Sequence, residues 1–210
     1  CDVDKHFTPE YNPWDQRLCL IPDGDLYKAL RNGKAEVVTD EIEQFCESGI
    51  TLKSGKVLES DIIVTATGLN LKLLGGISLR LDEKAISIPE CYSYKGLMFS
   101  GIPNLVYSLG YINASWTLRS EITAEFVCRV LNHMKTLNTG RVVANFNPDD
   151  VSSEDSAFIG DFNPGYITRS AHLMAKQSTK DPWRFNQNYS LDKKLIRNGK
   201  LEDGFLTFSN

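Results

Sequence analysis

The sequence predicts an α/β fold that contains a meander of short strands and one long helix. Two patterns support this prediction. Turn residues divide residues 35–58 into short segments of β-branched and apolar side chains, which is typical of antiparallel strands. Apolar side chains then recur every four residues from Leu118 to Met134. This period matches one face of a helix, which we expect from about Ser115 to His133.

A short helix is expected before the meander. Three prolines before residue 23 exclude one long helix there, because proline lacks the backbone N–H and clashes with the preceding turn. Asp23 can accept from the free N–H groups of a helix start, and Gly33 suits the position after a helix end. The strands that follow are expected at Ala35–Val38, Glu41–Cys46, Ile50–Leu52 and Val57–Leu58.

The segment Asp61–Gly68 is a continuous run of apolar and β-branched side chains that ends in glycine. Such a run is typical of a strand buried on both faces of a sheet. It would deliver Thr67 and Gly68 at the carboxyl end of that strand, where ligands collect in α/β sheets. A core strand that simply ends in a turn is the alternative.

Two more strands are expected at Leu97–Ser100 and Leu105–Gly110, on either side of a Gly-Ile-Pro-Asn turn. From Gly140 onward the sequence is polar and is interrupted by Asn-Pro and Asp-Pro pairs. Short helical turns and loops are therefore expected in this last part of the chain.

The composition argues against several classes of protein. A net charge of −4 over 210 residues gives no reason to expect a nucleic-acid partner. No apolar run approaches the ~18 residues that span a bilayer. Five cysteines without CxxC spacing and three separated histidines predict reduced thiols, a cytoplasmic location and no metal site. The first residue is Cys1 and not a methionine, so we expect a piece of a longer protein.

The turn from Gly110 to Thr117 is the first candidate site. It leads into the long helix, and the free N–H groups and dipole at a helix start stabilise negative charge. The pyrimidine edge of a flavin carries such charge on reduction, and Gly110 would let a planar ligand approach the backbone. A plain capped helix with Trp116 in the core is the alternative.

Arg17 is the second candidate. It follows Pro13-Trp14-Asp15-Gln16 in a loop rich in proline and aromatic residues. A guanidinium held there can stabilise an anion, whereas a surface arginine without a role is the alternative. The aromatic and amide-rich segment 183–189, which begins at Trp183, either lines a pocket or packs against the body of the protein.

Four segments carry a resemblance to a known family: residues 6–19 (HFTPEYNPWDQRLC), 61–71 (DIIVTATGLNL), 110–118 (GYINASWTL) and 183–189 (WRFNQNY). In this order they resemble the class B flavoprotein monooxygenases of the Baeyer–Villiger type, and most closely the bacterial thioamide-oxidising group. The resemblance runs along essentially the whole chain. It covers only the C-terminal half or less of such an enzyme.

The resemblance implies a domain organisation. The fold would be the C-terminal part of a flavoprotein with two dinucleotide-binding, Rossmann-like domains. Residues 1–68 would end the NADPH-binding domain, residues 69–140 would be the returning part of the FAD-binding domain, and residues 141–210 would form a C-terminal tail.

The resemblance also implies roles for single residues. Arg17 matches the catalytic arginine that stabilises the anionic peroxide at flavin atom C4a. Gln16 stands where the family often has a lysine that helps to select NADPH, so the choice between NADPH and NADH stays open. Trp183 is the candidate substrate contact. The candidate cofactor contacts, besides Gln16, are Thr67, Gly68, Gly110, Asn113, Ala114, Ser115, Trp116 and Thr117.

The implied activity is that of an FAD- and NADPH-dependent monooxygenase that inserts oxygen into ketones or oxidises sulfur compounds. The sequence contains no GxGxxG fingerprint for the ADP part of FAD. We therefore expect the rest of the same enzyme as a partner, and an isolated chain that is inactive and exposes edges that favour dimers. Two alternatives remain: a fragment of an N-hydroxylating flavin monooxygenase, or a non-catalytic interaction or assembly module.

Overall fold

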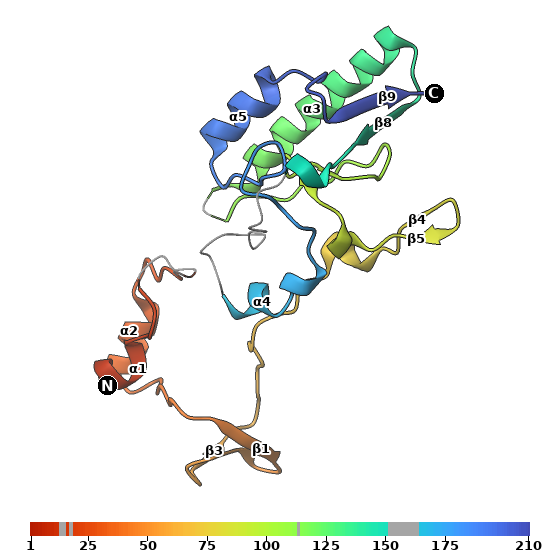
Figure 1. Ribbon diagram of the computed structural model, residues 1–210. Helices are drawn as coiled ribbons and strands as arrows, with labels where there is room; N and C mark the ends of the chain where they lie inside the picture. The colour runs from red at the N-terminus through yellow and green to blue at the C-terminus, as the bar shows by residue number, and fades with distance from the viewer. Residues whose placement is uncertain (13–15, 17–18, 113, 151–163) are drawn as a thin grey trace. The chain divides into compact units, whose positions relative to one another are not determined.

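The computed structural model describes residues 1–12, 16, 19–112, 114–150 and 164–210. The chain divides into two compact units, Cys1–Leu69 and Asn70–Asn210 (Figure 1). The first unit carries two short helices and a small sheet, and the second carries the long helix and most of the buried core. The α/β class with small antiparallel sheets and one long helix agrees with the prediction from the sequence.

The first unit begins with helices α1 (Val3–Phe7) and α2 (Asp25–Arg31). The expected short helix is present, and Gly33 has the left-handed conformation (φ 67°) that favours glycine after a helix end. Asp23 does not cap it. The N-cap is Gly24, and no side chain bonds to the helix start, because Asp23 lies one residue too early to reach the first free N–H groups.

The predicted meander is confirmed as a three-stranded antiparallel sheet in the order β1-β2-β3. Its strands are β1 (Ile42–Cys46), β2 (Gly49–Leu52) and β3 (Val57–Glu59). Gly49 begins β2 where a Cβ atom would lie 2.0 Å from the carbonyl oxygen of Leu58, so a larger residue does not fit. The expected strand Ala35–Val38 is absent, because no strand of the described residues pairs with it.

The prediction of a buried strand at Asp61–Gly68 is wrong for this structure. These residues form neither strand nor helix, and all of them are exposed. Val64 is 84% exposed and Ile62 is 81% exposed. A strand buried on both faces needs a neighbouring strand on each side, and the described part of the chain pairs none with it.

The second unit is built around helix α3 (Trp116–Leu137), as the four-residue period predicted, although α3 ends four residues later than expected. Helix α5 (Tyr189–Asn198) packs against α3, and strands β8 (Arg141–Ala144) and β9 (Leu206–Ser209) pair as an antiparallel ribbon in the same unit (Figure 1). The expectation of only turns and loops after Gly140 is therefore wrong. The core joins apolar side chains of all these elements, among them Ile122, Phe126, Val142, Ile196 and Leu206.

The remaining elements of the second unit are short. The expected strand Leu97–Ser100 is reduced to β7 (Met98–Phe99), and Leu105–Gly110 contributes a single bridge from Val106 to Met98. The short elements are β4 (Arg80–Leu81), β5 (Lys84–Ala85), β6 (Ser93–Tyr94), β7 (Met98–Phe99), α4 (Gly165–Thr168) and the 3₁₀ turns Leu73–Gly76, Ile88–Glu90, Pro148–Asp150 and Ala171–Leu173.

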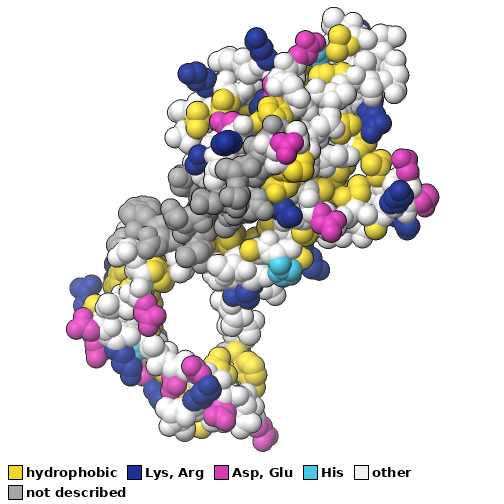
Figure 2. Space-filling model, viewed as in Figure 1, with side chains coloured by type: hydrophobic (Ala, Val, Ile, Leu, Met, Phe, Trp, Pro, Cys, Tyr) yellow, Lys and Arg dark blue, Asp and Glu magenta, His cyan; other side chains and the backbone are white. Residues whose placement is uncertain are grey.

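The surface agrees with the modest net charge of the sequence. On the face shown in Figure 2, acidic and basic side chains are interspersed with apolar ones. Among the described residues, no helix combines the length and apolar character that crossing a bilayer requires.

Candidate functional site

The start of α3 presents a capped, solvent-facing helix end. The Ser115 hydroxyl accepts from the backbone N–H of Thr117 at 3.3 Å and lies 2.7 Å from the Thr117 hydroxyl. Ser115, Trp116 and Thr117 are exposed, and Ala114 is half-buried. The backbone N–H groups of Thr117 and Leu118 already bond to Ser115, so this helix end would stabilise an anion mainly through its dipole. The predicted contact Asn113 lies outside the described residues.

The space beside the backbone of Gly110 is filled by another side chain of the protein. A Cβ atom at Gly110 would lie 2.0 Å from Cγ of Trp116, so the indole ring packs directly on the glycine backbone. The alternative that placed Trp116 in the core is wrong, because this side chain is 56% exposed. In this structure Gly110 makes room for the indole, whereas the sequence analysis expected it to make room for a planar ligand.

The residues at the beginning of the turn form hydrogen bonds with the C-terminal segment. The Tyr111 hydroxyl donates to Asp192 Oδ2 at 2.8 Å. The backbone N–H of Ile112 donates to Gln187 Oε1 at 2.9 Å. Both acceptors lie more than 70 residues further along the chain, so tertiary packing defines this entry to the turn.

Arg119 lies fully buried just after the turn. Its Nη1 atom donates to Asp192 Oδ2 at 2.6 Å, and its Nη2 atom donates to the carbonyl of Lys95. The guanidinium also lies over the Phe185 ring, 4.9 Å from its centre. Burial raises the pKa of Asp192, while Arg119 opposes that rise.

None of the four residues of this hydrogen-bonded cluster was a predicted site residue: Arg119, Asp192, Tyr111 and Gln187. One signal was available. Arg119 lies on the same buried helix face as Thr123, Phe126 and Val130, where a charged residue is unexpected unless it is paired. The partner at position 192 could not be named from the sequence, because the two residues are 73 positions apart.

The other predicted site residues are distributed through both units. Thr67 and Gly68 are exposed, and Gly68 has a φ of 95°, which favours glycine. Gln16 is half-buried, and Arg17 lies outside the described residues.

Trp183, the candidate substrate contact, is 1% exposed. Its ring packs edge-on against Tyr94, Phe146 and Phe205 in the core. In this structure Trp183 therefore packs against the body of the protein, which was the alternative to lining a pocket.

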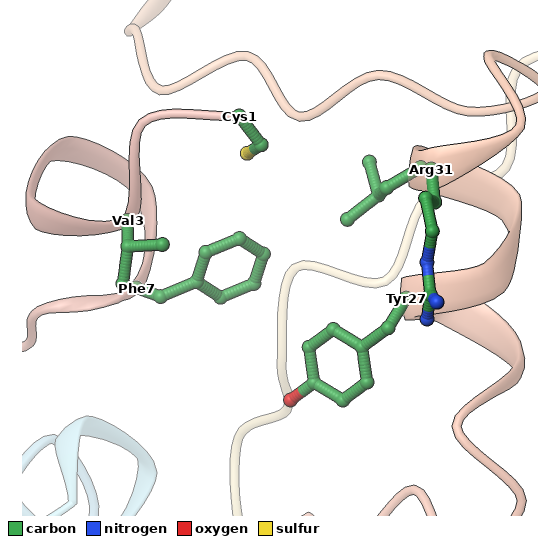
Figure 3. A pocket seen from close by; sticks show the side chains of 6 residues that line it. Cys1, Val3, Phe7, Tyr27 and Arg31 are labelled. Atoms are coloured by element: carbon green, nitrogen blue, oxygen red, sulfur yellow. The ribbon is translucent and has the colours of Figure 1, made fainter.

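A separate cavity lies between α1 and α2 in the first unit (Figure 3). Its volume is about 430 Å³, and Val3 and Phe7 of α1 face Tyr27 and Arg31 of α2 across it. None of these side chains was a predicted site residue. The residues described in both units contain no cluster of acidic, histidine or cysteine side chains that could hold a metal ion.

Comparison with known proteins finds relatives that match nearly the whole chain. No family model matches it. It is 52% identical over 208 residues to the FAD-containing monooxygenase EthA of Mycobacterium tuberculosis, which is 99% of this chain and 42% of that protein. The chain is homologous to a C-terminal portion of the FAD-containing monooxygenases.

Two other relatives agree. The probable FAD-binding monooxygenase AlmA of an Acinetobacter species is 48% identical over 204 residues, which is 97% of this chain and 41% of that protein. The putative FAD-containing monooxygenase MymA of Mycobacterium tuberculosis is 45% identical over the same shares of the two chains. The chain thus spans less than half the length of the curated relatives it matches.

Proposed function

We propose that the protein containing this chain is an FAD-dependent monooxygenase, and that residues 110–117 form the part of its flavin site contributed by this chain. The observation that carries the proposal is the 52% identity to an FAD-containing monooxygenase over 99% of the chain. Relatives with other names, at 48% and 45% identity, are also described as FAD-binding or FAD-containing monooxygenases.

The geometry of the α3 start suits a flavin. Its exposed first turn offers the positive end of the helix dipole and the hydroxyls of Ser115 and Thr117 to a ligand that carries negative charge. The indole of Trp116 offers an apolar surface beside these polar groups. Such a mixed polar and apolar surface matches a flavin ring, whose pyrimidine edge is polar and whose benzenoid edge is apolar.

The finer assignment follows the family resemblance. FAD would supply the redox and oxygen chemistry, with NADPH as reductant and a ketone or a sulfur compound as substrate. Arg17 would hold negative charge close to the reacting oxygen atoms, because a guanidinium stays protonated and offers several donors. Residues 1–68 would form the end of the NADPH-binding domain. Residues 69–140 would form the part of a Rossmann-like FAD-binding domain that follows it in the chain.

The direct test uses the protein that contains this chain, purified with its bound ligands. We expect one FAD per protein, NADPH oxidation, and conversion of a test ketone to an ester or a test sulfide to a sulfoxide. Hydroxylation of an amine would favour the N-hydroxylating alternative. A colourless protein that takes up no added FAD would contradict the proposal and favour a non-catalytic module.

Arg17→Ala tests the catalytic assignment in the same protein. We expect oxygenated product to be lost while NADPH oxidation stays measurable, because the variant removes a charge needed for oxygen transfer and leaves the flavin in place. Arg31→Ala is the control, since Arg31 lines the cavity between α1 and α2 and has no proposed role in catalysis. A product yield in Arg17→Ala equal to that of the unmodified protein would contradict the assignment.

A further inference from the structure

One carboxylate oxygen joins both ends of the turn that leads into α3. Asp192 Oδ2 accepts from the Tyr111 hydroxyl at 2.8 Å, before the turn, and from Arg119 Nη1 at 2.6 Å, after it. Gln187 Oε1 adds a bond to the backbone N–H of Ile112 at 2.9 Å. Two side chains of the C-terminal segment thus hold residues 111, 112 and 119, on either side of the exposed residues Ser115–Thr117.

We infer that Asp192 and Gln187 are positioning residues for the FAD site, and that the C-terminal segment sets FAD affinity through them without touching the cofactor. This inference rests on the proposed function, because it assumes that the α3 start contacts FAD. It adds a role for Gln187, whose segment 183–189 was predicted only to line a pocket or to pack, and for Asp192, which was not a predicted site residue.

The energetics of the cluster favour a positioning role. The side chains of Arg119 and Asp192 are 0% and 4% exposed, so both charges are removed from water. A buried ion pair contributes little stability compared with apolar residues of the same volume. Arg119 Nε is also buried, and no partner for it is found among the described residues, which adds a cost. The main effect of the pair is therefore on the conformation of the turn, since Asp192 fixes the distance between its two ends.

Helix α5 is also held to α3 by contacts that do not involve the turn. Arg129 of α3 donates to the carbonyls of Ile196 and Gly199, and Arg197 of α5 pairs with Glu125 of α3. A change at Asp192 therefore leaves α5 anchored through its C-terminal half. This separation supplies a matched control, because Arg197 links the same two helices away from the turn.

The experiment measures FAD binding to the apo form of the protein that contains this chain, through the quenching of flavin fluorescence. We expect Asp192→Asn to weaken FAD binding roughly tenfold to a hundredfold, because a charge-assisted bond to Arg119 is lost. Tyr111→Phe removes one hydroxyl and keeps the ion pair, and we expect it to weaken FAD binding about threefold to tenfold. The visible circular dichroism of the bound flavin should change in both variants.

Arg197→Gln is measured beside them, together with denaturant unfolding of each variant. We expect its FAD dissociation constant to equal that of the unmodified protein, whatever its stability. Tyr111→Phe keeps the test valid if Asp192→Asn fails to fold. FAD affinity that is unchanged in Tyr111→Phe, or that falls in all three variants in proportion to their stability, would overturn the inference. No FAD binding by the unmodified protein would instead contradict the proposed function.

Discussion

Asp203 is a half-buried carboxylate of the second unit, and the pKa of its side chain shifts in the opposite direction to that of Asp192. Burial alone would raise the pKa of Asp203, but hydrogen bonds from Tyr94 at 2.5 Å and Lys95 at 2.9 Å together lower it. Asp192 also accepts from a guanidinium and a hydroxyl, but its deeper burial outweighs both, and the pKa of its side chain is raised. The depth of burial therefore decides the sign of the shift.

Asp203→Asn tests this account through stability as a function of pH. An unfolded aspartate titrates near ~3.9, and the folded pKa of Asp203 lies lower. Its stabilising effect is therefore fully present above about pH 4 and is lost as the pH falls through the folded pKa. We expect the variant to lower the free energy of unfolding by about 1–3 kcal/mol at pH 7, and by less in acid.

Denaturant unfolding at a series of pH values from neutral to acid measures this difference. A loss of stability in Asp203→Asn that is the same at every pH would show that ionisation of the carboxylate does not contribute.

At the level of single residues, the sequence was informative where a signal is local. The apolar period predicted a helix that starts at about Ser115, and the structure confirms this start, with Ser115 as the N-cap. The pairing of Arg119 with Asp192 could not, because it depends on how α5 packs on α3. Trp183 belongs to an aromatic segment that is compatible with a pocket or a core, and only tertiary packing decides between them.

Helix α3 and the β8–β9 ribbon show the same distinction at the level of elements. The apolar period and cap of α3 lie within one segment, so the helix could be predicted. Strand β8 pairs with β9, and Ala144 lies opposite Leu206. Each strand is only four residues long, and each is stabilised by a partner about 60 residues away, so neither stands out by its own pattern.

The packing of Trp116 on Gly110 gives a prediction at this level. In Gly110→Ala the added methyl group would overlap the indole ring, which must move away from the α3 start. We expect a loss of about 1–3 kcal/mol in the free energy of unfolding and a shift of tryptophan emission to longer wavelength. Denaturant unfolding monitored by tryptophan fluorescence measures both the free energy of unfolding and the emission wavelength.

Gly140→Ala is the matched control, because a methyl group there would meet no atom within 4 Å. We expect it to change the free energy of unfolding by less than about 1 kcal/mol. Equal behaviour of the two variants would show that the indole does not depend on Gly110.

For the molecule as a whole, the segment Asp61–Gly68 shows a mismatch between composition and structure. Its β-branched composition is that of a doubly buried strand, yet all eight residues are exposed and unpaired within the described structure. The composition predicts burial only if partner strands exist. The chain spans 42% of the length of its EthA relative, and in our proposal the remaining sequence supplies those strands.

Photolabelling of the protein that contains this chain tests directly whether the start of α3 lies against FAD. An FAD analogue with a photoreactive azide on its ring system would be bound, irradiated and located by peptide mass spectrometry. We expect label within residues 110–119, which include the exposed start of α3, and less label when excess FAD competes. Specific label found only outside the 210 residues of this chain would contradict it.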